Sequence, residues 1–137
     1  MTAMIDSIRP DDTVVRLMRT PVASAETGWS VRNVAEELMA DEVGALLVDG
    51  VHGTVGIVSE RDVVVLVATG GDPDTTQARD IMTTELEWAE VDETIRRAAT
   101  RMRAAGIRHM PVRGADGRPV GIVSARDVLT VITDEPR

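Results

Sequence analysis

An eight-residue motif occurs twice in this chain and restricts its possible folds more than any other feature. Seven of the eight positions are identical between Gly56–Val63 (Gly-Ile-Val-Ser-Glu-Arg-Asp-Val) and Gly121–Val128 (Gly-Ile-Val-Ser-Ala-Arg-Asp-Val), at a shift of 65 residues. Upstream, matches such as Met18 with Met82 continue the similarity at a shift of 64. Such a fixed spacing indicates one supersecondary unit used twice. We therefore predict a leader over 1–11, repeat 1 over 12–69, a linker over 70–75 and repeat 2 over 76–133.

The hydrophobic core has to be built almost entirely from aliphatic side chains. The 137 residues include no Phe, no Tyr and two Trp, although 43% are hydrophobic. Val, Ile, Leu, Ala and Met must therefore fill a thin core between small elements. Each half is short for an independent domain, so we expect the two repeats to share one core.

Charge and composition exclude several classes of function. The net charge of −8 disfavours nucleic acid and anionic membrane surfaces as partners. The absence of Cys excludes disulfides and thiolate chemistry. The longest apolar run, Val63 to Ala68, is too short to cross a bilayer, and the N-terminus lacks a signal-peptide pattern. We expect a cytoplasmic protein.

Each repeat reads as strand, helix, strand, strand, helix. Ser30 and Thr94 are good N-cap residues and precede apolar residues at helical spacing. Gly106 suits a left-handed helix end, and Asp116-Gly117 suits a tight hairpin turn. The strands are expected around 22–25, 45–48, 86–89, 109–112 and 120–123.

The segment Val63–Val67 favours a strand by its β-branched content alone. Two observations favour a helix instead. Ser59 and Asp62 have capping-box spacing, which returns in repeat 2, and Gly70-Gly71 supplies a helix stop. We predict a helix.

The repeated Ser-x-Arg-Asp sequence has two interpretations. In the simpler one, Ser59 and Ser124 are N-caps, and the aspartates three residues later complete the caps. A cap, however, does not require arginine before the aspartate, and both repeats have it. A helix N-terminus with a hydroxyl and a guanidinium suits a phosphate, and a neighbouring carboxylate can accept the two hydroxyls of a ribose.

With these residues in place, the chain resembles a tandem pair of CBS domains, a Bateman module. The resemblance runs from about Thr13 to Thr133. Its markers are the duplicated motif, Asp-Ile-Met-Thr at 80–83 and Met-Pro-Val at 110–112. It implies an α/β (α+β) fold of two β-α-β-β-α repeats, with small mixed sheets flanked by helices and related by a pseudo-twofold axis. It also implies an adenosine ligand, such as AMP, ADP or ATP, in a cleft between the repeats.

The resemblance assigns residues to two clefts. In the favoured one, Asp127 would hold the ribose, Ser124 and Arg126 would face phosphate, and Arg108 and His109 would add positive charge beside Met110 and Pro111. The adenine would be bordered by Thr20, Pro21, Val22 and Ala23. The less favoured cleft would use Ser59, Arg61, Asp62, Thr84, Leu86, Ala45 and Leu46. There, Gly44 and Ala45 replace the basic pair, and Glu85 and Glu87 crowd the approach.

The sequence contains no nucleophile elbow, no Walker loop and no metal-binding cluster, so we expect no enzyme, no catalytic cofactor and no metal site. His52 is expected to be a surface loop residue. The leading hypothesis is a regulatory module that senses an adenine nucleotide, forms a homodimer and acts on an effector protein. The alternative is a ligand-free dimerisation scaffold in which the motif only caps helices.

Overall fold

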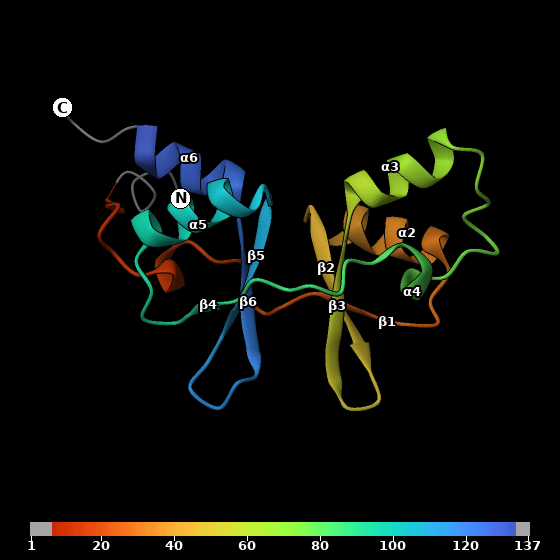
Figure 1. The fold of residues 1–137 in the computed structure, drawn as a ribbon, viewed down its shortest axis with the longest axis horizontal. Coiled ribbons are helices and arrows are strands. Elements are labelled where there is room, and N and C mark those ends of the chain that lie inside the picture. Colours follow the sequence, from red (N-terminus) through yellow and green to blue (C-terminus); the bar gives the residue numbers. More distant parts are fainter. Residues whose placement is uncertain (1–6, 134–137) are drawn as a thin grey trace. The chain divides into compact units, whose positions relative to one another are not determined.

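The computed structural model describes residues 7–133, and these residues form two compact units. Unit 1 contains the chain up to Pro21 and from Glu87 onward, and unit 2 is Val22–Leu86. Each unit holds one three-stranded sheet with helices beside it (Figure 1).

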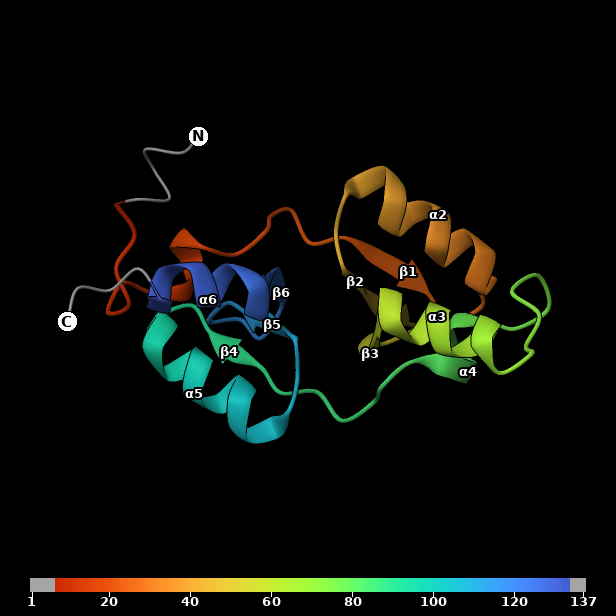
Figure 2. The ribbon, with the colours of Figure 1, turned by 90° about the horizontal axis from the view of Figure 1, so that it is seen from above.

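Unit 2 follows the predicted β-α-β-β-α order and ends with one further helical turn. Its sheet has the order β1-β2-β3, with β1 parallel and β3 antiparallel to β2. Helices α2 and α3 lie side by side, as Figure 2 shows from above. The elements are β1 (Ser24–Glu26), α2 (Val31–Asp41), β2 (Ala45–Gly50), β3 (Gly53–Ser59), α3 (Glu60–Ala68) and α4 (Ala78–Ile81).

Unit 1 repeats this architecture. Its sheet has the order β4-β5-β6 with the same parallel and antiparallel pairing. The elements are the 3₁₀ turn η1 (Val14–Arg16), β4 (Ala89–Glu90), α5 (Ile95–Ala105), β5 (His109–Arg113), β6 (Pro119–Ser124) and α6 (Ala125–Thr133). The predicted fold class, two β-α-β-β-α repeats with small mixed sheets, is confirmed.

The segment that leads into each repeat pairs with the sheet of the other repeat. Arg19 and Ile122 exchange two backbone hydrogen bonds of 2.8 and 3.2 Å, and Thr83 and Ile57 exchange two of 2.9 Å. Each compact unit therefore contains the residues that precede the first strand of the other repeat. The predicted domain limits of 12–69 and 76–133 follow the sequence repeat instead.

This pairing explains why the motif begins with glycine. A Cβ atom on Gly121 would lie 2.7 Å from the carbonyl oxygen of Arg19 and 2.8 Å from the sulfur of Met18. On Gly56 it would lie 2.7 Å from the sulfur of Met82. Real Cβ atoms essentially never approach this closely, so only glycine lets the lead segment reach the sheet.

The expectation of one shared core is wrong. The buried side chains of residues 7–133 form two clusters, one around Leu46 and Val58 in unit 2 and one around Met110 and Val123 in unit 1. The segment before the first strand of repeat 1 contributes to the core of the other repeat, since Val14 is buried in the core of unit 1. Because each sheet buries one face beneath its own helices, each unit can form its own core.

The predicted helix ends are confirmed. The hydroxyls of Ser30 and Thr94 accept hydrogen bonds of 3.1 Å from backbone amides three residues later, and Gly106 has φ 67°. In repeat 1 Glu42 takes the same left-handed conformation, with φ 53°. The Val63–Val67 segment is helical, within α3.

Other details differ from the sequence prediction. The first strands begin two to three residues later than expected, because only Ser24–Glu26 and Ala89–Glu90 lie opposite their partner strands. Helix α4 was not predicted. It is a single turn held by a capping box between Gln77 and Asp80. Residues 1–6 of the predicted leader lie outside the described residues.

Candidate functional site at the start of helix α6

The end of β6 and the start of α6 bring the repeat 2 motif to one end of unit 1. Ser124 is the last residue of β6, and its hydroxyl accepts a 3.1 Å hydrogen bond from the backbone N–H of Asp127. In the sheet, His109 lies opposite Ser124. The N–H of Ala125 donates to the carbonyl oxygen of Arg108 at 2.7 Å. The structure thus brings the Arg108-His109 pair beside the Ser124–Asp127 motif.

The lead segment of repeat 1 reaches the same sheet. Because Arg19 is hydrogen-bonded to Ile122, two residues before Ser124, the exposed Thr20 and Pro21 belong to unit 1. The next predicted site residues, Val22 and Ala23, begin unit 2. The structure therefore groups Thr20 and Pro21 with the other repeat 2 site residues in unit 1.

Two residues of the favoured predicted site are buried. Met110 is part of the core of unit 1, and Pro111 is also fully buried. The Met110 side chain packs in the interior, so its contribution to a ligand site is limited to its backbone.

Unit 2 has the same backbone arrangement with different side chains. Ala45 lies opposite Ser59, and the N–H of Glu60 donates to the carbonyl oxygen of Gly44 at 3.0 Å. Leu46, like Met110, is buried in the core. The remaining predicted residues of this second set, Arg61, Asp62, Thr84 and Leu86, also belong to unit 2.

The two motif aspartates differ in their hydrogen bonds. The Asp62 carboxylate accepts from the N–H of Ser59 at 2.8 Å and from the Ser59 hydroxyl at 3.1 Å, which completes a capping box. Within residues 7–133, the Asp127 carboxylate accepts no hydrogen bond. The capping-box prediction is therefore confirmed for Ser59 and Asp62, whereas Ser124 and Asp127 form only half of it.

The two sites also differ in charge. In addition to the motif arginine, unit 1 has Arg19, bonded through its backbone to Ile122, and Arg108, bonded through its backbone to Ala125. Unit 2 has Thr83 and Gly44 at the equivalent positions. Unit 1 also has Ala125 where unit 2 has the acidic Glu60. The start of α6 is therefore the more basic of the two. Arg19 was missed by the sequence reasoning, although a comparison of repeats at the shift of 64 would have identified it as a charge difference.

Glu87, which was expected to crowd the less favoured cleft, is hydrogen-bonded to Arg101 instead. Glu87 belongs to unit 1, where its carboxylate accepts from Arg101 at 3.1 Å. Arg101 also makes two bonds, of 2.7 and 2.8 Å, to the buried Glu93. The hydrogen bond to Glu93, more than the one to Glu87, raises the pKa of Arg101 above its ordinary value. Glu87 is thus held by α5, while Glu85 is exposed.

The remaining candidate features carry no site. His52 is an exposed residue of the β2–β3 turn, as predicted. No group of three or more acidic or histidine side chains suited to a metal ion occurs in the described part of the chain. Among the described helices, none combines the length and apolar character needed to span a membrane.

Comparison with known proteins identifies the family. The CBS domain family matches residues 14–69 and 78–134, which together make up most of the chain. This chain belongs to the CBS domain family, and the two matches make it a tandem CBS pair. No catalytic family is indicated by this match.

Three relatives place this assignment in context. An uncharacterized protein of Methanopyrus kandleri, MK0525, is 30% identical over 120 residues; the match covers 86% of this chain and only 61% of that protein. The CBS domain pair of protein MJ0100, solved with 5′-methylthioadenosine and S-adenosyl-L-methionine, is 26% identical with a TM-score of 0.80, covering 90% of this chain and 98% of that one. The cytosolic domain of the Mg²⁺ channel MgtE, solved with ATP, is 28% identical with a TM-score of 0.70, covering 88% and 49%.

Proposed function

We propose that this chain is a regulatory module that senses an adenine nucleotide, AMP, ADP or ATP, at the start of helix α6. The observation that carries the proposal is the Asp127 carboxylate, which accepts no hydrogen bond within residues 7–133, whereas its counterpart Asp62 completes a helix cap. An ionised carboxylate beside a helix N-terminus is suited to accept the two hydroxyls of a ribose.

The neighbouring groups suit the other parts of a nucleotide. Ser124 precedes α6 and Arg126 lies in its first turn, where the helix dipole favours an anion. Arg108, whose carbonyl oxygen is bonded to the N–H of Ala125, adds a further positive charge. His109 lies opposite Ser124. Thr20 and Pro21, with Val22 and Ala23 after them, are proposed to border the adenine. The complexes of relatives with ATP, S-adenosyl-L-methionine and 5′-methylthioadenosine support an adenosine-containing ligand.

The equivalent position in unit 2 is proposed to bind more weakly or not at all. A ribose at Asp62 has to compete with two hydrogen bonds from Ser59. The adjacent Glu60 also repels phosphate, whereas repeat 2 has Ala125 there. One occupied site per chain follows.

The proposed output is a change in association with another protein rather than catalysis. We propose a cytoplasmic homodimer that passes ligand binding to an effector protein, without a nucleic-acid or membrane partner. The net charge of −8 supports the last point.

Titration calorimetry with adenosine, AMP, ADP, ATP, S-adenosyl-L-methionine and 5′-methylthioadenosine tests this proposal. We expect AMP or ATP to bind at least tenfold more tightly than adenosine, since charge-assisted bonds to phosphate contribute about 1.5–3 kcal/mol each. Arg126→Ala should remove most of that preference, and Arg118→Ala, on the β5–β6 turn, should not.

Two results would redirect the proposal. If S-adenosyl-L-methionine binds preferentially, the proposed site stands, but its ligand is S-adenosyl-L-methionine rather than a nucleotide. If none of the six compounds binds at millimolar concentration, the ligand-free scaffold becomes the better description.

A further inference from the structure

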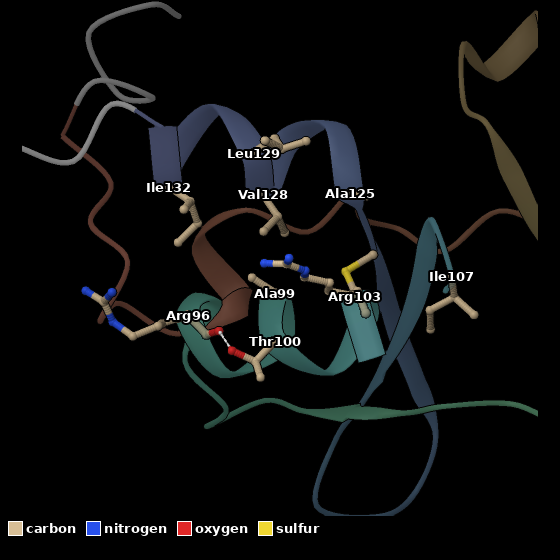
Figure 3. A pocket seen from close by; sticks show the side chains of 10 residues that line it. Arg96, Ala99, Thr100, Arg103, Ile107, Ala125, Val128, Leu129 and Ile132 are labelled. Carbon is tan, nitrogen blue, oxygen red and sulfur yellow. Dashed lines mark hydrogen bonds between the residues drawn. The ribbon is translucent and has the colours of Figure 1, made fainter. Parts of the chain in front are cut away.

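Helices α5 and α6 of unit 1 border an open groove of about 490 Å³. Figure 3 shows Val128 and Ile132 pointing from α6 toward Ala99 on α5. Of the ten residues that line the groove, seven are apolar, and the others are Thr100, Arg96 and Arg103. The groove is therefore an apolar surface with two positive charges.

The two arginines of the groove differ in what they contact. Arg96 forms an ion pair with Asp11. The Arg103 guanidinium forms no hydrogen bond or ion pair within residues 7–133. Figure 3 shows the Arg103 side chain extending into the space between Val128 and Ala99. The groove thus offers one positive charge that no described residue neutralises, with aliphatic side chains around it.

The size and shape of the groove favour a small, elongated ligand. A volume of about 490 Å³ lies within the usual range of small-molecule sites, roughly 300–1,000 Å³. Only ten residues line the groove, whereas a stable protein interface uses about 20–30 residues from each partner. On α6 the lining runs from Ala125 to Ile132, which is about 10 Å at the helical rise. An extended alkyl chain fits along two helices better than a compact ring system does.

The corresponding surface of unit 2 lacks the charge of this groove. By the repeat, Met39 of α2 takes the position of Arg103, and Glu36 takes that of Thr100. A cation is thus replaced by an apolar side chain, and a carboxylate is added nearby. An anionic ligand is therefore expected at the groove of unit 1 and not at its counterpart in unit 2.

We propose that the α5–α6 groove binds a medium-chain fatty acid, with the carboxylate on Arg103 and the alkyl chain along Leu129 and Ile132. The guanidinium can donate two parallel hydrogen bonds to a carboxylate. The alkyl chain and the aliphatic side chains remove each other's surface from water. This site lies apart from the carboxylate of Asp127 and does not depend on nucleotide binding. The chain would thereby respond to a lipid-derived anion in addition to the proposed nucleotide.

Titration calorimetry of the full chain with octanoate, decanoate, dodecanoate and decanol tests this proposal, at ligand concentrations below micelle formation and without nucleotide. Among the carboxylates, the affinity should rise about two- to fourfold with each added methylene group, because each adds buried apolar surface. Decanol lacks the charge and should bind about tenfold more weakly than decanoate.

Substitutions locate the ligand. Arg103→Ala should weaken decanoate binding about tenfold and leave decanol binding unchanged, whereas Arg118→Ala, on the β5–β6 turn, should change neither. Leu129→Glu places a carboxylate in the groove and should abolish decanoate binding. Its matched control is Val64→Glu at the equivalent position of α3, since these two side chains are 57% and 63% exposed. Melting curves check that the variants fold.

Several results would overturn the proposal. Equal affinity for decanoate and decanol, or an Arg103→Ala variant that binds decanoate like the parent, would show that no carboxylate is recognised. If Leu129→Glu binds decanoate normally, or Val64→Glu is impaired to the same extent, the ligand does not lie in the groove. The proposal also fails if none of the four compounds binds. A lower mass of Leu129→Glu in sedimentation velocity would then show that a second molecule occupies the groove.

Discussion

The two motif aspartates provide a matched pair of substitutions whose effects on stability and binding should be opposite. In Asp62→Ala, the Ser59 amide and hydroxyl lose their acceptor, which costs about 1–2 kcal/mol as for other helix caps. The better helix propensity of alanine returns about 0.5 kcal/mol. The net loss of about 1 kcal/mol should lower the Tm by about 4 °C for a chain of this size.

In Asp127→Ala no such bond to a residue between 7 and 133 is lost. The only stabilising term removed is the charge near the helix N-terminus, about 0.3–1 kcal/mol, which the gain in propensity largely offsets. The melting temperature should stay within about 2 °C of the parent's. If Asp127 holds a ribose, its removal costs about 1.5–3 kcal/mol of binding, a loss of about 10- to 150-fold in affinity.

Thermal unfolding followed by circular dichroism and titration calorimetry with ATP separate these effects. We expect Asp62→Ala to melt lower and bind normally, and Asp127→Ala to melt normally and bind weakly. The reasoning is refuted if Asp127→Ala melts as low as Asp62→Ala and binds ATP like the parent, because Asp127 would then be a helix cap.

Two further changes test how the site is supported. Gly121→Ala should lower stability by about 1–3 kcal/mol, because its Cβ atom would collide with Arg19, and it should weaken nucleotide binding as well; Gly28→Ala, with open space around its Cβ position, should do neither in calorimetry and melting experiments. Glu93→Gln should cost about 1–3 kcal/mol in chemical denaturation, since it weakens a buried pair with the partly exposed Arg101, and a loss under 0.5 kcal/mol would show that the pair contributes little.

The sequence allowed a good prediction of the local structure. The repeat fixed the order of elements, and the caps at Ser30 and Thr94 located the first helices of both repeats. The helical state of α3 followed from its capping box, although Val63–Val67 has a strong strand propensity. In each of these helix caps the deciding interaction joins residues three positions apart, so it is visible in a short stretch of sequence.

The features that were missed depend on distant residues. The bond between Arg19 and Ile122 joins residues about a hundred positions apart, and no local pattern indicates it. This pairing brings Thr20 and Arg19 into the unit that contains Asp127, and it gives each repeat's core a segment from the other. The late start of the first strands has a similar origin, because their length is set by the partner strand.

Duplication explains why sequence identity in the motif does not imply equal function. Ser-x-Arg-Asp occurs in both repeats with equivalent strand pairing at its serine. The carboxylate nevertheless completes a cap in one repeat and accepts no hydrogen bond within the described residues in the other. Under the function proposed above, the copy whose carboxylate is not used in a cap binds the ligand, and the other copy stabilises a helix. The same divergence made α2 acidic and α5 basic. The two similar halves of the chain therefore differ in the hydrogen bonding of the motif aspartate and in the charge of the first helix.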